Sequence, residues 1–130
     1  MKESYVIDAG VISLFAGHVV KRYFEDMVGN RVRLVTSELT LAEFIFHYAR
    51  RFGKDVVVAR YRSLRNSPLE VISPDSWITE TAGVVKASHG ERLSLADCFL
   101  VATAMKVKGT VLTTDSRIRD VYGRVIKIEY

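Results

Sequence analysis

Short β-rich runs alternate with segments of helical periodicity along the whole chain, and this alternation constrains the fold more than any other feature. Tyr5-Val6-Ile7 is the first such run. The expected strands are residues 5–7, 33–36, 69–72, 111–113 and 124–129. Because strands separated by helices need right-handed crossovers, they form a mostly parallel sheet that is covered on both faces. The sequence therefore predicts an α/β fold with three layers, α/β/α, and a mostly parallel central sheet.

Apolar residues recur every three or four positions in the segments between these strands, as in amphipathic helices. The expected helices cover residues 12–27, 39–52, 56–64, 74–85 and 95–106. Ser73 and Pro74 predict the start of the fourth helix, because serine caps free amides and proline is tolerated at the first helical position. Ser94 predicts the cap of the last helix, and Gly53 and Gly90 predict the ends of the second and fourth helices.

The size and composition of the chain fit one folded domain over residues 1–130. Its mass is 14.7 kDa, and 48% of its residues are hydrophobic, which argues against disorder. The longest mostly apolar stretch, Cys98 to Met105, is far shorter than the roughly 18 to 20 residues of a membrane span. Cys98 is the single cysteine, so the chain has no internal disulfide. We therefore expect a soluble cytoplasmic protein that does not enter a membrane.

Positive charge is concentrated between Arg50 and Arg65. The formal net charge is +4, and this segment carries six basic residues against the single acid Asp55. Such a cluster can contact nucleic-acid phosphates. It can equally be the solvated face of two helices, and the sequence does not separate the two interpretations. The candidate RNA contacts are Arg50, Arg51 and Lys54.

Four acids lie inside or directly after apolar runs, and they are the strongest candidates for chemistry. They are Asp8, Glu43, Asp97 and Asp115. A carboxylate costs several kcal/mol to remove from water unless it is paired, hydrogen-bonded or bound to a metal. Asp8 and Asp115 follow expected strands, and ligands bind beyond the carboxyl ends of strands in open parallel sheets. The sequence has no phosphate loop, dinucleotide fingerprint, CxxC, HExxH or GxSxG motif, and we assign the three histidines no role.

Each of these acids, taken alone, also has an ordinary structural role. Asp8 and Asp115 can cap a helix or stand in a turn. Thr40-Leu41-Ala42-Glu43 and Ser94-Leu95-Ala96-Asp97 both fit a capping box, in which the carboxylate reaches back to the amide of the cap. These structural roles are the better interpretation for each residue taken singly. The four acids taken together favour a functional interpretation.

The joint pattern resembles the PIN domain, in particular the single-domain VapC-type toxin ribonucleases of toxin-antitoxin pairs. The resemblance covers the whole chain. It rests on four motifs in register, namely Tyr5-Val6-Ile7-Asp8-Ala9-Gly10-Val11-Ile12, Thr40-Leu41-Ala42-Glu43-Phe44, Leu93-Ser94-Leu95-Ala96-Asp97-Cys98-Phe99-Leu100-Val101-Ala102-Thr103-Ala104 and Val111-Leu112-Thr113-Thr114-Asp115. One departure is Gly10, where the family often has serine, threonine or asparagine. Ser13 or Thr113 are the candidates to supply that hydroxyl.

The resemblance implies hydrolysis of RNA phosphodiester bonds that depends on a divalent metal. The implied ligands and catalytic residues are Asp8, Glu43, Asp97 and Asp115. Clustered carboxylates repel one another unless they are protonated or bind a cation, and oxygen ligands without His or Cys favour Mg²⁺ or Mn²⁺. Thr113 is expected to donate a hydrogen bond to these acids without contacting the metal itself. The resemblance further implies a cognate antitoxin protein and a homodimer, with a docking groove formed by Phe44, Phe46, Tyr48, Tyr61 and Leu64 unless these residues are core.

Three other interpretations compete with this one. A stand-alone PIN nuclease of RNA processing would have the same acids and no antitoxin. A non-catalytic RNA-binding or interaction module would use the basic segment and would not need all four acids. A receiver-like phospho-acceptor domain needs two acids after the first strand and a lysine near a later strand end, and the sequence has neither where required.

Overall fold

The computed structural model describes residues 2–14 and 18–129, and its helices and strands alternate along the chain. Over these residues the strands are β1 (Ser4–Ile7), β2 (Arg33–Ser37), β3 (Glu70–Ile72), β4 (Thr110–Thr113) and β5 (Val125–Lys127). The α-helices are α1 (Ala9–Ser13), α2 (His18–Val28), α3 (Glu38–Phe52), α4 (Lys54–Arg65), α5 (Ser76–His89) and α6 (Leu95–Val107). Two short 3-10 helices, η1 (Gly90–Arg92) and η2 (Ser116–Asp120), follow α5 and β4. The predicted strands are confirmed, with ends that differ by at most two residues.

The strands form one sheet with the order β3-β2-β1-β4-β5, and all four pairings are parallel. Val6 in the central strand β1 lies opposite Val35 on one side and Val111 on the other. Because the strands are parallel, their carboxyl ends meet at one edge of the sheet. The residues that follow β1, β2 and β4 are therefore brought together there.

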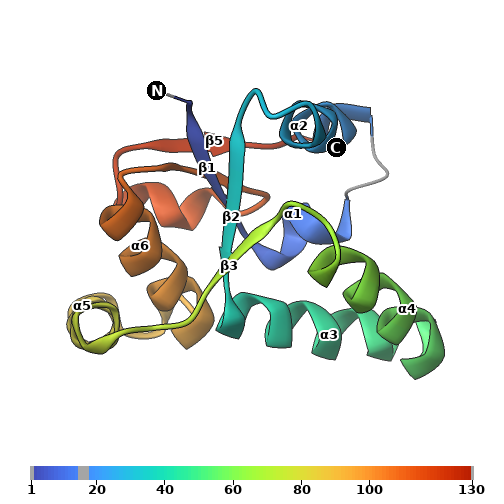
Figure 1. Ribbon diagram of the computed structural model, residues 1–130. Coiled ribbons are helices and arrows are strands. Elements are labelled where there is room, and N and C mark those ends of the chain that lie inside the picture. The colour runs from blue at the N-terminus through green and yellow to red at the C-terminus, as the bar shows by residue number, and fades with distance from the viewer. Residues whose placement is uncertain (1, 15–17, 130) are drawn as a thin grey trace.

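Alternate residues of the strands build two cores, one on each face of the sheet. Ile7 and Leu112 pack with the buried side chains of α1 to α4, among them the fully buried Phe44. Val6 and Val111 pack on the other face against α5 and α6. Figure 1 shows α1 to α4 on one side of the sheet and α5 and α6 on the other. The predicted three-layer α/β/α arrangement is confirmed.

The single helix expected over residues 12–27 is wrong, because the structure has two helices there, α1 and α2. Asp8 caps α1, so the first helix begins directly after β1 and ends at Ser13. The apolar spacing continues into α2 with a shift of one position. Val20 is buried where the regular spacing would bury Val19, which is 49% exposed. The expected contribution of Phe15 lies outside the described residues.

One predicted helix start and one possible capping box are wrong, in both cases because another side chain is the better cap. Helix α5 begins at Ser76 with Asp75 as its N-cap, not at Ser73 and Pro74, and the Asp75 carboxylate accepts the Ile78 N–H at 2.8 Å. Helix α3 begins at Glu38, one residue before the expected start, with the Ser37 hydroxyl as its cap in place of Thr40, so the capping box at Glu43 does not form. Glu43 therefore lies in the second turn of α3, where its carboxylate has no capping role.

No helix in residues 2–14 and 18–129 is long and apolar enough to cross a lipid bilayer.

Candidate active site

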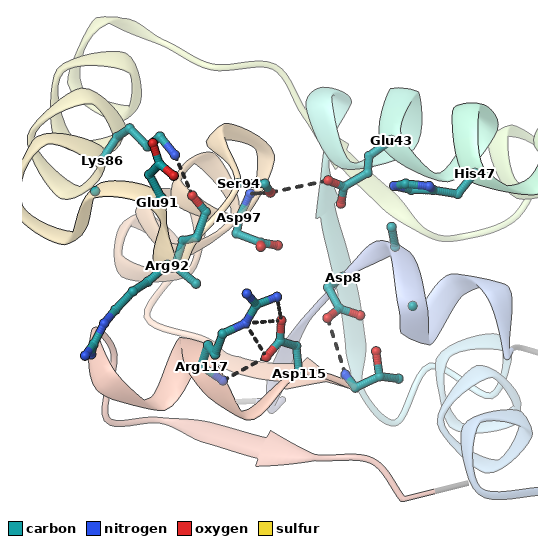
Figure 2. Close-up of a pocket in the computed structure, with 15 residues that line it drawn as sticks. Asp8, Glu43, His47, Lys86, Glu91, Arg92, Ser94, Asp97, Asp115 and Arg117 are labelled. Atoms are coloured by element: carbon teal, nitrogen blue, oxygen red, sulfur yellow. Dashed lines mark hydrogen bonds and ion pairs between the residues drawn. The ribbon is translucent and has the colours of Figure 1, made fainter.

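A cleft of about 750 Å³ opens at the edge of the sheet where β1 and β4 end. All four acids singled out from the sequence line it, each from a different segment of the chain. Asp8 follows β1, Glu43 comes from α3, Asp97 from α6, and Asp115 from the turn after β4. Figure 2 shows their side chains around one open space. The structure thus brings together four acids that are distant in the sequence.

Asp8 is the most buried of the four acids, with 5% of its surface exposed. Its Oδ1 accepts the Val11 N–H at 2.8 Å, which makes it the N-cap of α1 as its position after a strand suggested. Its Oδ2 accepts hydrogen bonds from the Thr113 hydroxyl and, at 3.3 Å, from the Thr114 N–H. Burial raises the pKa of Asp8, and repulsion from Asp97 adds to the rise, although these hydrogen bonds oppose it.

The Ser94 hydroxyl links Glu43 on α3 to Asp97 on α6. It donates a hydrogen bond to Glu43 Oε2 at 3.3 Å and accepts the Asp97 N–H at 3.1 Å. Ser94 is the N-cap of α6, so the predicted cap is confirmed. One hydroxyl therefore caps α6 at the backbone of Asp97 and bonds the carboxylate of Glu43, so it ties α6 to α3 beside the cleft (Figure 2).

Burial raises the pKa values of both Glu43 and Asp97. Repulsion from Asp97 adds to the rise at Glu43, and His47 partly opposes it. Repulsion from Asp115 adds to the rise at Asp97, where hydrogen bonding from Ser94 acts in the other direction. These acids therefore lie where a cation would stabilise their charged form.

Asp115 differs from the other three acids because the positively charged side chain of Arg117 already pairs with it. The Arg117 guanidinium donates from Nε at 2.8 Å and from Nη2 at 2.5 Å to Asp115 Oδ2. The Asp115 Oδ1 also accepts the Arg117 backbone N–H at 2.9 Å, which caps η2. Hydrogen bonding from Arg117 holds the pKa of Asp115 below its usual range.

Thr113, which we expected to support the acids, lies buried between two of them. Its hydroxyl donates to Asp8 Oδ2 and accepts the Asp115 N–H at 2.9 Å. Ser13, the other candidate to replace a hydroxyl at position 10, uses its hydroxyl within α1, where it donates to Ala9 O at 2.9 Å. Neither of these hydroxyls lies against Gly10. The side chain that does so is that of Thr114, which also lines the cleft.

The basic residues that line the cleft are not those singled out from the sequence. Arg50, Arg51 and Lys54 are exposed at the junction of α3 and α4, and none of the three lines the cleft. The guanidinium groups of Arg50 and Arg51 stack instead on nearby phenylalanine rings, at 5.4 and 5.2 Å. The structure therefore does not bring these three candidates to the acids, and their contact with RNA stays a prediction.

Four basic side chains that sequence reasoning missed do line the cleft. They are His47, Lys86, Arg92 and Arg117. His47 had a usable signal, because it stands four residues after Glu43 on the same helix and so on the same face. Arg117 stands two residues after Asp115. Lys86 and Arg92 had no signal in the sequence, because they reach the cleft only through the packing of α5 and η1 beside α6.

The donor set of the cleft fits a hard divalent cation by its chemistry, since five carboxylates, those of the four acids and of Glu91, offer oxygen ligands without a cysteine. Over residues 2–14 and 18–129, no group of three or more His, Cys, Asp or Glu side chains is arranged closely enough to hold an ion directly. The structure thus gathers the acids in one cleft, but no three of their side chains are close enough together to bind the same ion directly. Mg²⁺ keeps several waters when it binds protein, so it suits such an open arrangement.

Comparison with known proteins identifies the family. The family model of the PIN domain matches residues 5–124. The chain belongs to the PIN domain family. Among solved structures, VapBC2 from Rickettsia felis bound to a DNA fragment from its promoter matches with a TM-score of 0.78 at 13% identity, over 97% of this chain and 99% of that chain.

Two further solved structures share the PIN fold of this chain. DNA-bound VapBC from Salmonella typhimurium matches with a TM-score of 0.73 at 18% identity and covers 98% of each chain. The sarcin-ricin loop cleaving toxin VapC20 of Mycobacterium tuberculosis matches with a TM-score of 0.71 at 16% identity, over 95% of this chain and 98% of that chain. No curated protein matches the sequence significantly. At these identities the likeness shows a shared fold.

Proposed function

We propose that this PIN-domain protein is a metal-dependent endoribonuclease, a single nuclease domain over residues 1–130 and the toxin of a type II toxin-antitoxin pair. One observation carries the proposal: the PIN fold gathers Asp8, Glu43 and Asp97 in one cleft, where burial and mutual repulsion raise their pKa values. When no cation is bound, the charged carboxylates of such a site lower the free energy of unfolding. A divalent cation would remove that destabilisation, and a phosphate would complete its shell.

Asp8 and Asp97 are the acids that we expect to hold Mg²⁺ or Mn²⁺ directly, and Glu43 and Asp115 complete the set. Asp8 is oriented by three hydrogen-bond donors, so its carboxylate is held in place before the ion arrives. When bound there, the ion would polarise the scissile phosphate and lower the pKa of the attacking water.

Glu43 is better suited than Asp115 to take the proton of the attacking water. Arg117 already occupies the Asp115 carboxylate, whereas Glu43 has no ion-pair partner in the described part of the chain. The Ser94 hydroxyl orients the Glu43 carboxylate toward the cleft. Asp115 is neutralised by Arg117 and would act as a ligand.

RNA is the substrate that the cleft and the fold together favour. Lys86, Arg92 and Arg117 line the cleft beside the acids and can neutralise the phosphates of a polyanion. One neighbour in fold, VapC20 of Mycobacterium tuberculosis, is a toxin that cleaves the sarcin-ricin loop. Arg50, Arg51 and Lys54 remain candidate contacts for RNA that extends beyond the cleft along α3.

A cognate antitoxin is the partner that we propose, because solved structures with this fold include VapBC from Salmonella typhimurium and a toxin-antitoxin complex from Klebsiella pneumoniae. The groove expected for it is mostly core. Phe44 and Leu64 are buried, Tyr48 and Tyr61 pack half-buried against them, and Phe46 alone of the five is exposed, at 52%. We also propose a homodimer and a cytoplasmic location.

The test is an RNA cleavage assay with purified protein in Mg²⁺ and in EDTA. Cleavage should require the metal and should be lost in Asp97→Asn. The matched control is Asp55→Asn, which removes an exposed acid that does not line the cleft. Circular dichroism should show that all chains are folded. Metal-independent RNA binding without products would favour a non-catalytic module, and equal cleavage by Asp97→Asn and the control would refute the proposal.

A further inference from the structure

The side chain of Thr114 occupies the space that any side chain at position 10 would need. A Cβ added to Gly10 would overlap Thr114 Oγ1 and would lie 3.2 Å from both Cβ and Cγ2 of Thr114. Rotation about χ1 of Thr114 moves Oγ1 away, but it leaves the Cβ of Thr114 in the same place. Glycine at position 10 is therefore what lets the Thr114 side chain lie against the start of α1 in the wall of the cleft.

Thr113 and Thr114 are neighbours in sequence, but their hydroxyls have different surroundings. The Thr113 hydroxyl is buried and is used within the protein, where it donates to Asp8 and accepts the Asp115 N–H. Successive side chains at the end of a strand point in opposite directions, and Thr114 lines the cleft instead. Over residues 2–14 and 18–129 its hydroxyl makes no hydrogen bond, while its backbone N–H donates to Asp8 Oδ2.

The donors around Asp8 are already in use, with the exception of the Thr114 side chain. The Val11 N–H, the Thr113 hydroxyl and the Thr114 N–H all donate to the Asp8 carboxylate. A phosphate that approaches Asp8 together with a metal ion brings further oxygens that accept hydrogen bonds. Of the side-chain donors beside Asp8 and Gly10 in the described part of the protein, the Thr113 hydroxyl is already used and the Thr114 hydroxyl is not.

We propose that the Thr114 hydroxyl donates a hydrogen bond to a non-bridging oxygen of the RNA phosphate bound beside Asp8, and that Gly10 is required because it makes room for this hydroxyl. The inference rests on the proposed ribonuclease function and adds a substrate-contacting residue to it. It also gives Gly10 a role: the polar group at this wall of the cleft comes from the residue after β4 instead of from α1.

The first test compares Thr114→Val, which keeps the shape of the side chain, with Thr114→Ser, which keeps the hydroxyl. Loss of one hydrogen bond to a charged oxygen should lower kcat/KM for RNA cleavage about ten- to a hundred-fold in Thr114→Val. Thr114→Ser should recover most of that loss. The melting temperature of Thr114→Val should stay near that of the wild type, since the lost hydroxyl has no partner within the protein. Thr113→Val should be clearly less stable, because Asp8 loses a buried donor.

The second test moves the hydroxyl from position 114 to position 10, in the same wall of the cleft. Gly10→Ser alone should lose at least as much activity as Thr114→Val, because the two side chains compete for one space. The double variant Gly10→Ser with Thr114→Gly provides that space and returns a hydroxyl from α1. It should be more active than Gly10→Ser or Thr114→Gly alone, and a double-mutant cycle measures this coupling. Additive losses would show that the two side chains do not compete for one space.

A binding measurement separates this inference from the proposed function. Fluorescence anisotropy with a labelled single-stranded RNA, with all four acids intact and with Ca²⁺ in place of Mg²⁺ to slow cleavage, should show several-fold weaker binding by Thr114→Val than by the wild type. Full cleavage activity and unchanged RNA affinity in Thr114→Val would overturn the inference while leaving the nuclease intact. If the wild type cleaves no RNA, the proposed function fails, and unchanged affinity or no RNA binding at all would then overturn the Thr114 contact as well.

Discussion

Asp8 and Asp115 follow two neighbouring parallel strands, β1 and β4, and line the same cleft, yet their charges are controlled in opposite ways. Burial raises the pKa of Asp8, and its hydrogen-bond partners are all uncharged donors. Asp115 is partly exposed and carries its own counter-ion, so Arg117 lowers its pKa. The end of a strand brings an acid to the cleft, but its local partners decide how strongly that acid needs a cation.

This difference divides the cleft into two regions. Asp8, which is buried, forms an inner region with the half-buried Glu43 and Asp97, in which the carboxylates repel one another and no arginine or lysine of the described residues is bonded to them. Asp115 and Arg117 form an ion pair beside it, in which Arg117 is exposed and Asp115 half-buried. We therefore expect a divalent cation to be held mainly by the inner region, and the following predictions compare the two.

The largest expected effect is on catalysis. Asp8→Asn should lower the rate of RNA cleavage on the order of 10²- to 10³-fold or more, because removal of a metal ligand forfeits several kcal/mol of transition-state stabilisation. Asp115→Asn should cost less, roughly ten- to a hundred-fold, since Arg117 already neutralises this acid. Steady-state cleavage of a labelled RNA measures both variants. A larger loss in Asp115→Asn than in Asp8→Asn would reverse the assignment of the two regions.

The second effect is stabilisation by metal. At a Mn²⁺ concentration one hundred times its Kd, binding to the folded state alone adds about 2.7 kcal/mol to the free energy of unfolding. For a domain of this size that is on the order of 10 °C in Tm. Asp97→Asn should lose most of this increase, whereas Asp115→Asn should keep most of it. Differential scanning calorimetry in Mn²⁺ and in EDTA gives the comparison, and an equal increase in all three proteins would mean that the ion binds elsewhere.

The third effect is a pH dependence of opposite sign in the two regions. The raised pKa of Glu43 means that its contribution to stability is complete below its ordinary value of 4.5 and is lost as the pH rises through the raised pKa. The lowered pKa of Asp115 means that its contribution is complete above its ordinary value of 3.8 and is lost as the pH falls through the lowered pKa.

Calorimetry in EDTA from about pH 2.5 to 7 tests these signs. The Tm of the wild type relative to Glu43→Gln should fall as the pH rises above 4.5. The Tm of the wild type relative to Asp115→Asn should fall as the pH decreases below 3.8. Glu80→Gln, an exposed helical glutamate outside the cleft, is the control and should show no such trend. The same sign for both acids would contradict the difference between the two regions.

The smallest effect is expected for Arg117→Gln. The Arg117 side chain is 60% exposed, and exposed ion pairs stabilise proteins little because solvent screens them. The Tm should therefore stay near that of the wild type. The pKa of Asp115 should rise, because its main cause of depression is removed, and a pH titration followed by NMR measures it. An unmoved pKa of Asp115 would show that Arg117 is not its counter-ion.

The sequence predicted the strands, the layers and the positions of Asp8 and Asp115, because the ends of parallel strands share one edge of the sheet. It did not predict from periodicity that Glu43 and Asp97 meet there, since their approach depends on how α3 packs against α6. The resemblance to the PIN domain supplied that pairing. The link through Ser94 was recognised only as a helix cap, and nothing in the pattern predicted its bond to Glu43.

The parts that sequence reasoning missed have local physical causes. The break between α1 and α2 is hidden because residues of both helices face the same core, so the apolar spacing continues across it. Helix α5 begins at Ser76 and not at Pro74 because the Asp75 carboxylate is a stronger cap than the Ser73 hydroxyl at this position. Lys86 and Arg92 reach the cleft through tertiary packing, which leaves no trace in local spacing.

The most direct test of the account is isothermal titration calorimetry with Mn²⁺ at several pH values, repeated in buffers of different ionisation enthalpy. We predict one binding process that releases more protons as the pH is lowered, because the pKa values of Asp8, Glu43 and Asp97 are raised and the ion binds their charged forms. Asp8→Asn and Asp97→Asn should each abolish or strongly weaken it. Unchanged affinity in both variants, or no binding by the wild type, would contradict the central claim that these acids form a metal site.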